Sequence, residues 1–378
     1  MEYTKLKYIN QYKSKSINPA KTPDTIFEMY SVPIYATGHP EYLRGDEIAS
    51  NKAIVRKNDI LLCKINPRIN RVWVVSDESG KQNIASSEWI VIRNSEYNPE
   101  FLAWYFRTPK FQKFMTSEIT GIGGSLTRAQ PKCVAEYPVP VLNRKKQDEI
   151  VNILDKCKLV IDSRKRELLE LDNIIKARFV EMFGDININD KHWECEPLGE
   201  LCAIVRGGSP RPIEQFLGGD VPWIKIGDAT DGDNIYLSST KEHIIQEGVK
   251  KSRLVKAGSL IFANCGVSLG FARIITFDGC IHDGWLAMEG IDERLDKVFL
   301  LQALNQMTEH FRAIAPAGTQ PNLNTAIMKA YKQVIPPIEL QRDFIRFVKQ
   351  VNKSKVKVQK ALDETQKLFD SLMQQYFG

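Results

Sequence analysis

A chain of 378 residues is longer than a single hydrophobic core usually supports, so its length predicts two or more domains. Hydrophobic residues make up 43% and charged residues 26%, as in soluble globular proteins, and no apolar run is long enough to span a bilayer. The net charge of +6 permits a nucleic acid partner, but many proteins that bind none share such a charge.

The cysteines and histidines show no pattern typical of a metal centre or a disulfide framework. The seven cysteines include no Cys-x-x-Cys pair, and the five histidines have no zinc-binding spacing. The first residues also lack the apolar core of a signal peptide. We therefore expect a cytoplasmic protein that contacts no membrane and binds no metal.

Residues 1–142 have the pattern of an α+β domain. Short apolar segments such as 72–75 and 89–92 predict strands, and a helix is expected over residues 99–116. The aromatic residues Trp104, Tyr105 and Phe106 of that helix are expected in the core. Two loops are rich in polar and basic side chains, and their candidate DNA-binding residues are Lys64, Asn66, Arg68, Asn70, Arg71, Ser125, Arg128 and Gln130.

Residues 143–184 predict one long helix. Proline precedes it at 138 and 140, and apolar residues follow alternating steps of four and three, as along the seam of a coiled coil. Eight of ten seam positions are apolar, and a glycine ends the segment. Arg164 and Arg178 occupy seam positions, where a polar residue can set the register of pairing or extend toward solvent.

Residues 185–338 repeat the frame of the first domain with different loops. The run 255–262 parallels 55–62 as a turn that leads into a buried strand, and Trp285 lies 196 positions after Trp89. A helix is again expected after the tryptophan, over residues 295–313. The candidate DNA-binding residues of these loops are Arg206, Ser209, Arg211, Lys225, Asn264, Ser268, Thr319, Gln320, Asn322 and Asn324.

Residues 339–378 repeat the first long helix. Residues 147–184 and 341–378 align without a gap at an offset of 194, which places Gln147 on Gln341 and Phe183 on Phe377. The second seam also has eight apolar positions of ten, with Lys355 among the others. Two such units in one chain predict an internal pseudo-two-fold axis and an antiparallel coiled coil of helices about 57 Å long.

The loop residues favour DNA as the partner. Arginine, lysine, asparagine and glutamine make paired hydrogen bonds to base edges, whereas serine, threonine and backbone amides favour phosphates. Two domains that share a fold but differ in their loops are expected of a protein that recognises two different DNA sequences. The alternative is a two-domain coiled-coil adaptor that binds proteins, for which exposed aromatic anchors in the loops would be expected.

Motifs for catalysis are absent or incomplete. The sequence has no Gly-x-x-x-x-Gly-Lys-Ser/Thr loop for ATP and no Asn/Asp-Pro-Pro-Tyr/Phe tetrapeptide of an adenine methyltransferase. Residues 266–270 match Gly-x-Ser-x-Gly, but 271–276 read as a strand where a nucleophile elbow needs a helix. We therefore expect no catalytic centre.

The whole chain resembles the specificity subunits of type I restriction–modification systems. The resemblance is carried by the proline-led glutamine starts and Phe-Gly ends of both long helices, and by 207–210 followed by 221–225, which look like the usual opening of a target-recognition domain. Ser209 stands where threonine is frequent, and residues 13–19 replace the glycine pair in the first domain. The resemblance implies that each domain reads one half of a bipartite double-stranded DNA site and that the helices set the spacing.

The resemblance also implies partners. Two methyltransferase subunits would bind S-adenosylmethionine and methylate adenine, and restriction subunits would use ATP and magnesium. These cofactors would belong to the partners, so none is expected on this chain. The helical pair is the expected docking surface for the methyltransferase subunits. Related enzymes with fused cleavage and methylation subunits could use the same architecture.

Overall fold

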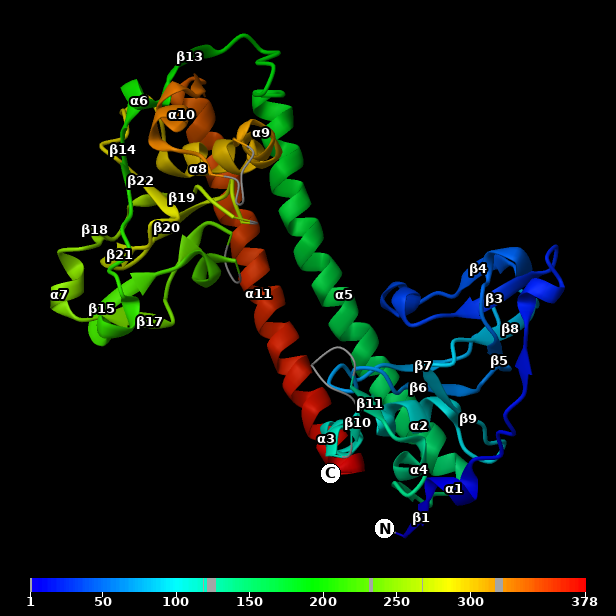
Figure 1. Ribbon diagram of the computed structural model, residues 1–378. Helices are drawn as coiled ribbons and strands as arrows, with labels where there is room; N and C mark the ends of the chain where they lie inside the picture. The colour runs from blue at the N-terminus through cyan, green and yellow to red at the C-terminus, as the bar shows by residue number, and fades with distance from the viewer. Residues whose placement is uncertain (1, 118, 121–126, 231–233, 267, 317–321) are drawn as a thin grey trace. The chain divides into compact units, whose positions relative to one another are not determined.

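The computed structural model describes residues 2–117, 119–120, 127–230, 234–266, 268–316 and 322–378 (Figure 1). It divides the chain into two compact units: Met1–Lys165 with Lys360–Gly378, and Arg166–Gln359. We call them unit 1 and unit 2. Each unit combines a globular part with one end of both long helices, so the units do not coincide with the four segments expected from the sequence. The boundaries of those segments stay a prediction.

Unit 1 has two main sheets. The first has the order β7-β6-β9, and its central strand is buried along its whole length because the apolar run Ile-Leu-Leu-Cys lies between two neighbours. The second has the order β2-β5-β8-β3-β4 and is antiparallel except between β3 and β8. The strands are β2 (Ser16–Ile17), β3 (Ile26–Tyr30), β4 (Glu41–Arg44), β5 (Lys52–Ile54), β6 (Ile60–Cys63), β7 (Val72–Val74), β8 (Gln82–Ala85) and β9 (Trp89–Ile92).

Smaller elements complete unit 1. Strand β1 (Tyr3–Lys5) pairs with β12 (Pro138–Pro140), and β10 (Ile119–Thr120) pairs with β11 (Arg128–Ala129). Short helices link these strands. They are α1 (Leu6–Ile9), η1 (Pro19–Lys21), η2 (Pro33–Thr37), η3 (Gly45–Glu47), α2 (Pro99–Phe106), α3 (Pro109–Ser117) and α4 (Pro131–Val134).

The single helix expected over 99–116 is two helices, α2 and α3. Helix α2 begins at Pro99 after Asn98, whose side chain accepts hydrogen bonds from two backbone N–H groups. The break falls before Pro109, because proline has no N–H to continue the helical ladder. Trp104, Tyr105 and Phe106 are buried, which confirms that they belong to the core.

Unit 2 repeats the arrangement around β19. Strand β19 lies between β20 and β22, as β6 lies between β7 and β9. The sheets have the orders β14-β22-β19-β20-β16, β17-β15-β21-β18 and β13-β23. The strands are β13 (Glu194–Pro197), β14 (Ala203–Arg206), β15 (Leu217–Ile224), β16 (Tyr236–Leu237), β17 (Glu242–Ile244), β18 (Arg253–Val255), β19 (Leu260–Ala263), β20 (Ala272–Ile275), β21 (Gly279–Ile281), β22 (Trp285–Glu289) and β23 (Lys332–Ile335).

The short helices of unit 2 parallel those of unit 1, except that the α-helix α7 stands where unit 1 has the 3-10 helix η3. They are α6 (Leu198–Leu201), η4 (Ile213–Gln215), η5 (Ile226–Ala229), α7 (Gln246–Val249), α8 (Lys297–Gln306), α9 (Thr308–Ile314) and α10 (Thr325–Ala330). The turns that lead into β6 and β19 also match, since Asn58 has φ 70° and Gly258 has φ 85°. The predicted α+β frame, present twice in the chain, is confirmed.

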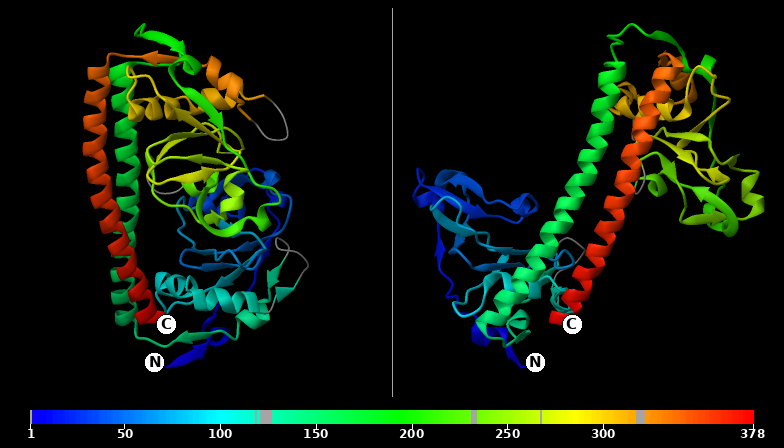
Figure 2. Two further views of the ribbon diagram at one scale, coloured as in Figure 1. Left: turned by 90° about the vertical axis from the view of Figure 1, so that its left-hand side faces the viewer. Right: turned by 180° about the vertical axis from the view of Figure 1, so that it is seen from behind.

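Two 40-residue helices, α5 (Arg144–Phe183) and α11 (Ile338–Phe377), take part in both units. In unit 2 the end of α5 lies beside the start of α11, with the Phe183 and Phe344 ring centres 5.5 Å apart. In unit 1 the start of α5 shares a core with the end of α11, including Leu154 and Phe377. Within each unit the two helices therefore run antiparallel, as the repeat predicts (Figure 2).

Two of the polar seam residues, Lys355 and Arg178, have defined contacts in unit 2. The ammonium group of Lys355 on α11 lies 2.7 Å from a carboxylate oxygen of Asp172 on α5. Their side chains are 17% and 28% exposed, so water screens this pair less than a surface pair. The guanidinium of Arg178 lies 5.8 Å from the ring centre of Phe347. Both contacts join the two helices and disfavour a shifted register.

Each long helix is fastened at its start by a buried glutamine. The carbonyl oxygen of Gln147 accepts from the N–H of Asn98 at 2.7 Å, and that of Gln341 accepts from the N–H of Asp296 at 2.8 Å. The amide group of Gln341 donates to the backbone oxygens of Arg294 (2.8 Å) and Pro336 (2.7 Å). Asn98 and Asp296 are the N-caps of α2 and α8, so each glutamine joins a long helix to a helix of its own unit.

Each long helix is fastened at its end by phenylalanine. The ring of Phe377 lies 5.5 Å from that of Phe101 on α2, and the ring of Phe183 lies 4.8 Å from that of Phe299 on α8. Gly184 follows with φ 76°, the left-handed conformation in which helices commonly stop. The Phe-Gly endings found in the sequence are therefore docking points for the globular parts.

All seven cysteines are described, and all are free. Burial raises the pKa of the Cys202 thiol to about 11, which leaves it unreactive at neutral pH. Within the described ranges, no cluster of three or more histidine, cysteine or acidic residues could hold a metal ion. None of the described helices is both long enough and apolar enough to cross a membrane.

We predict that Gln341→Leu destabilises the protein by about 1–3 kcal/mol, because one buried and two partly buried backbone groups lose their hydrogen-bond partner. The free energy of unfolding is measured by urea titration followed by circular dichroism. Gln350→Leu, at an exposed position of the same helix, is the control and should change stability little. Equal losses in the two variants would contradict the anchoring role.

Candidate nucleic-acid interface

In unit 1 two of the predicted loops lie side by side. The N–H of Asn66 donates to the backbone oxygen of Thr127 at 2.8 Å, and the N–H of Ala129 donates to that of Lys64 at 2.8 Å. These bonds join the chain after β6 to the chain before α4, and Ile65 forms an antiparallel bridge with Arg128. Asn66 has φ 46°, so the chain turns sharply after the bridge. Lys64, Asn66 and Arg128 are thus brought together from distant parts of the sequence.

Arg128 is held by a carboxylate that the sequence analysis did not single out. Its Nε and Nη2 donate to the two carboxylate oxygens of Glu88 at 3.2 and 3.3 Å. The side chains are 43% and 27% exposed. The hydrogen bonds and charge of Glu88 raise the pKa of Arg128 above its ordinary value, so the guanidinium remains charged. The backbone oxygen of Glu88 also accepts from the N–H of Lys64 at 3.0 Å.

The other predicted residues of unit 1 have different environments. Arg68 is exposed, whereas the amide of Asn70 donates to the backbone oxygen of Phe106 at 2.9 Å and so helps to hold the loop on α2. The guanidinium of Arg71 lies 3.8 Å from the sulfur of Cys63. Gln130 is the N-cap residue of α4, and its side chain makes no capping bond. Ser125 lies outside the described residues.

We call this bridged pair of segments, the chain after the central strand and the chain before the small helix, the loop junction. Unit 2 contains the same loop junction with different side chains. Cys265 bridges Asn322, the N–H of Leu323 donates to the backbone oxygen of Asn264 at 2.8 Å, and Gly266 has φ 73°. Asn264 and Asn322 therefore occupy the places of Lys64 and Arg128. The N–H of Asn264 donates to the backbone oxygen of Gly284 at 3.0 Å, as that of Lys64 does to Glu88.

Asn264 itself is fully buried. Its side-chain amide donates to the side-chain oxygen of Asn322 at 3.1 Å and to the backbone oxygen of Leu323 at 3.0 Å. This burial is at odds with a direct contact to DNA and instead makes Asn264 a support for Asn322. Nearby, Asn324 caps α10 by accepting from the N–H of Ile327 at 2.9 Å. Thr319 and Gln320 lie outside the described residues.

Three predicted residues of unit 2 converge on Asp283, which the sequence analysis missed. The hydroxyl of Ser209 donates to its carboxylate at 2.8 Å, a guanidinium nitrogen of Arg211 lies 3.5 Å away, and Nε of Arg206 donates to its backbone oxygen at 3.0 Å. Burial alone would raise the pKa of Asp283, but the bond from Ser209 and nearby positive charges bring it below its ordinary value. Asp283 is therefore ionised at neutral pH.

His282 belongs to the same cluster. Its Nδ1 accepts from the N–H of Gly284 at 2.9 Å, which leaves Nε2 as the protonated nitrogen of the neutral ring, 3.0 Å from the Asp283 carboxylate. Burial lowers the pKa of His282, and the charge of Asp283 offsets this only in part. Trp223 packs against His282 with ring centres 5.6 Å apart.

Lys225 and Ser268 lie on two further loops of unit 2. The ammonium group of Lys225 lies 5.8 Å from the ring centre of Trp223 and pairs with Glu242, so it adjoins the Asp283 cluster. Ser268 lies on the turn between β19 and β20, within the Gly-x-Ser-x-Gly match. A strand follows that turn, as the sequence analysis expected, and a nucleophile elbow requires a helix there.

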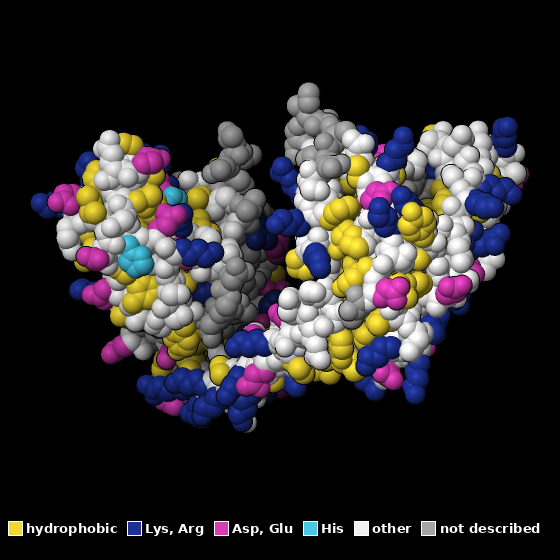
Figure 3. All heavy atoms as spheres, turned by 90° about the horizontal axis from the view of Figure 1, so that it is seen from below, with side chains coloured by type: hydrophobic (Ala, Val, Ile, Leu, Met, Phe, Trp, Pro, Cys, Tyr) yellow, Lys and Arg dark blue, Asp and Glu magenta, His cyan; other side chains and the backbone are white. Residues whose placement is uncertain are grey.

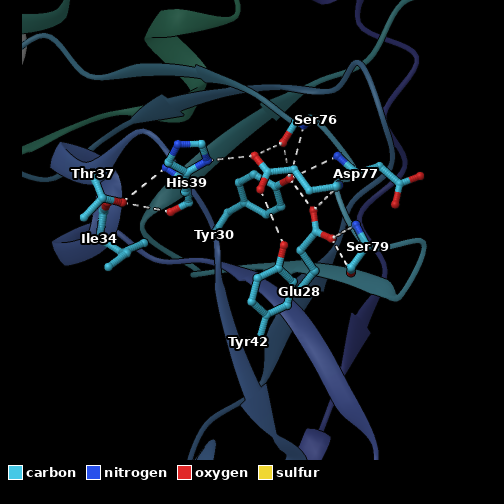
Figure 4. A network of polar contacts seen from close by, with 10 residues as sticks. Glu28, Tyr30, Ile34, Thr37, His39, Tyr42, Ser76, Asp77 and Ser79 are labelled. Atoms are coloured by element: carbon cyan, nitrogen blue, oxygen red, sulfur yellow. Dashed lines mark hydrogen bonds and ion pairs between the residues drawn. The ribbon is translucent and has the colours of Figure 1, made fainter.

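Residues 76–80 of unit 1 form a further anchored loop, which carries acidic rather than basic side chains (Figure 4). The buried carboxylate of Glu28 accepts from the phenol of Tyr30 at 2.8 Å and from the N–H groups of Glu78 and Ser79, both at 2.9 Å. Burial alone would raise the pKa of Glu28, but a hydrogen bond from the Ser79 hydroxyl, together with the three bonds above, brings it below its ordinary value. Because Asp77 and the exposed Glu78 disfavour phosphate, this loop is the weaker candidate for contact with DNA.

Surface charge by itself does not locate the interface. Figure 3 shows lysine and arginine side chains spread over the face in view and interspersed with aspartate and glutamate. The geometry of the loops is therefore the better guide. In each unit it brings together the loop after the central strand, a short segment before a small helix, and the turn before the strand that pairs with the central strand, β9 or β22.

Comparisons with known proteins found relatives among type I restriction specificity proteins. The model of the type I restriction modification DNA specificity domain matches residues 190–365. Residues 190–365 are thus similar to that specificity domain. The chain is 22% identical over 187 residues to the type I restriction enzyme MjaIX specificity subunit of Methanocaldococcus jannaschii. That alignment covers 45% of this chain and 40% of the archaeal protein.

Solved structures share the fold over nearly the whole chain. One comes from work on complex assembly and conformational transition of the type I R-M system, with a TM-score of 0.62, 18% identity and coverage of 100% of this chain and 97% of that one. The S subunit of a type I restriction–modification system from M. genitalium has a TM-score of 0.53, 15% identity and coverage of 98% and 97%. The predicted fold of two α+β domains with two long helices is thereby confirmed.

The neutral His282 gives a pH prediction. Because its folded-state pKa lies below the ordinary 6.5, the unfolded chain takes up a proton first as the pH falls, and stability decreases below pH 6.5. His282→Gln removes this contribution. We expect its melting temperature to fall less than that of the wild type between about pH 7.5 and pH 5.5. An equal or larger fall in the variant, measured by differential scanning fluorimetry, would contradict the assignment.

Proposed function

We propose that this chain is the DNA-sequence-specificity subunit of a type I restriction–modification complex. The observation that carries the proposal is the repeated loop junction: one backbone arrangement presents Lys64, Asn66 and Arg128 in unit 1 and Asn264, Gly266 and Asn322 in unit 2. A shared frame with different polar side chains suits two readers of different DNA sequences. Each globular part then recognises one half of a bipartite double-stranded site.

The long helices have two roles in this proposal. They set the spacing between the half-sites, and their exposed flanks dock two methyltransferase subunits, with restriction subunits joining the assembly. The chain contributes recognition and no catalysis. S-adenosylmethionine, ATP and magnesium are bound by the partner subunits. The match of residues 190–365 to a DNA specificity domain supports this role over the alternative of a protein-binding adaptor.

The proposal is tested by co-expressing the chain with its methyltransferase subunit and mapping methylated adenines in the host DNA. We expect an asymmetric bipartite motif that disappears when this chain is deleted. Unmodified DNA with no copurifying methyltransferase would favour the adaptor. Binding that does not weaken with added salt would also count against DNA, because contacts to phosphates release counterions.

We predict that replacing residues 1–142 with the corresponding part of another specificity subunit changes one half of the methylated motif and leaves the other half intact. The reason is that each globular part has its own core and its own contact loops. Methylation mapping of the hybrid provides the readout. A change in both halves would refute modular recognition.

We also predict that deleting one heptad from each helix, residues 162–168 and 356–362, shortens the spacer of the motif before it alters the bases read. Seven helical residues correspond to about 10 Å, or roughly three base pairs. Because the two deletions fall at equivalent positions, the two helices still align with each other without a gap. An unchanged spacer in a folded, active variant would exclude the helices as the element that sets the spacing.

A further inference from the structure

We propose that Arg128, held in place by Glu88, reads a guanine in the half-site recognised by unit 1. The inference rests on the proposed function and adds a base and a positioning residue to it. Glu88 accepts hydrogen bonds from Nε and Nη2 of Arg128, along one side of the guanidinium. Among the described residues, no hydrogen bond occupies the N–H groups at the far end of the fork, on Nη1 and the outer side of Nη2.

The far end of the fork matches one base. Guanine presents two acceptors, O6 and N7, in the major groove, and arginine donates to both at once. A phosphate is the poorer ligand here, because the Glu88 carboxylate beside the guanidinium repels a second anion. The acceptors of guanine are neutral and do not meet this repulsion. The pairing with Glu88 therefore shifts Arg128 from a general phosphate contact toward recognition of a base.

The backbone holds both members of the pair. The N–H of Lys64 donates to the oxygen of Glu88 at 3.0 Å, and the oxygen of Lys64 accepts from the N–H of Ala129, next to Arg128, at 2.8 Å. One residue of the loop after β6 thus connects the two segments. A fixed guanidinium loses less conformational entropy on binding than a free side chain would. Arg128 is still 43% exposed, so a base edge can approach it.

Unit 2 provides a comparison within the same chain. The equivalent of Arg128 is Asn322, whose side-chain oxygen accepts from Asn264, and the equivalent of Glu88 is Gly284, which has no carboxylate. An asparagine cannot present the paired donors of a guanidinium fork, and its amide is suited to adenine. The junction thus accepts either residue without a change of backbone, so Arg128→Asn is a substitution that the fold already tolerates.

The test uses the full chain assembled with its methyltransferase subunits and a pool of duplexes with randomised half-sites. We expect the wild type to select a bipartite motif with a G·C pair in one half. Arg128→Asn should lose about 5- to 150-fold of the preference at that pair and keep the other half-site. Because no phosphate contact is removed, the slope of log affinity against log salt should stay the same.

Arg44→Gln is the matched control. Arg44 is also an arginine of unit 1 paired with carboxylates, those of Asp24 and Asp46, but it lies outside the junction. The control should retain the guanine preference. Glu88→Gln should weaken that preference in the wild-type background and have no further effect at that pair when combined with Arg128→Asn, as expected of a residue that acts through Arg128.

The outcomes separate the two proposals. If the wild-type assembly selects no motif, the proposed function fails and the guanine assignment fails with it. If the wild type selects a motif and Arg128→Asn leaves it unchanged, or the affected half contains no G·C pair, only the guanine assignment is overturned. If folded Arg128→Asn loses affinity for all sequences and shows a smaller salt slope, Arg128 is a phosphate contact. The guanine assignment is then overturned as well. If the effects of Glu88→Gln and Arg128→Asn on the guanine preference are additive, Glu88 does not act through Arg128, and its assignment as a positioning residue is overturned.

Discussion

The structure depends on how its two long helices are fastened at their ends. A 40-residue helix has far more surface than it can bury alone, and isolated helices gain most of their stability from packing. Here a buried glutamine ties each start to the N-cap of a domain helix, and a phenylalanine at each end packs against an aromatic ring of a globular part. Because α5 begins in unit 1 and ends in unit 2, while α11 does the reverse, each unit contains one start and one end. The repeat in the sequence is therefore also a repeat of anchoring contacts.

The contact loops also repeat one backbone arrangement in the two units. In each unit the chain after the central strand is bridged to the segment before a small helix. It also donates a backbone hydrogen bond to the turn before the paired strand, β9 in unit 1 and β22 in unit 2. These bonds use backbone atoms, so the side chains at the junction can differ without disturbing the frame. Unit 1 places a paired arginine there and unit 2 an asparagine supported by a second, buried asparagine. Such a separation of scaffold and contact residues suits the proposed role, because the DNA sequence that is recognised can change while the fold is kept.

Carboxylates organise the polar surroundings of these loops. Glu88 orients Arg128, Asp283 gathers Arg206, Ser209 and Arg211, and Glu28 holds the loop after β7. Each has several donors directed at it, which explains why Glu28 and Asp283 stay ionised despite burial. None of the three stood out in the sequence. Their partners are distant along the chain, and a single Asp or Glu near a turn has no signature of its own.

The sequence by itself determined the repeat, the two long helices with their apolar seams, the buried aromatic stretch of α2 and the loops that carry polar side chains. These features are periodic or local, and local chemistry encodes them. Only the tertiary structure decided that Asn264 is buried, and that Arg128 meets Glu88 while Asn322 takes the equivalent place in unit 2. Those outcomes depend on contacts between residues tens of positions apart, and the hydrogen bonds that form them become visible only once the strands have paired.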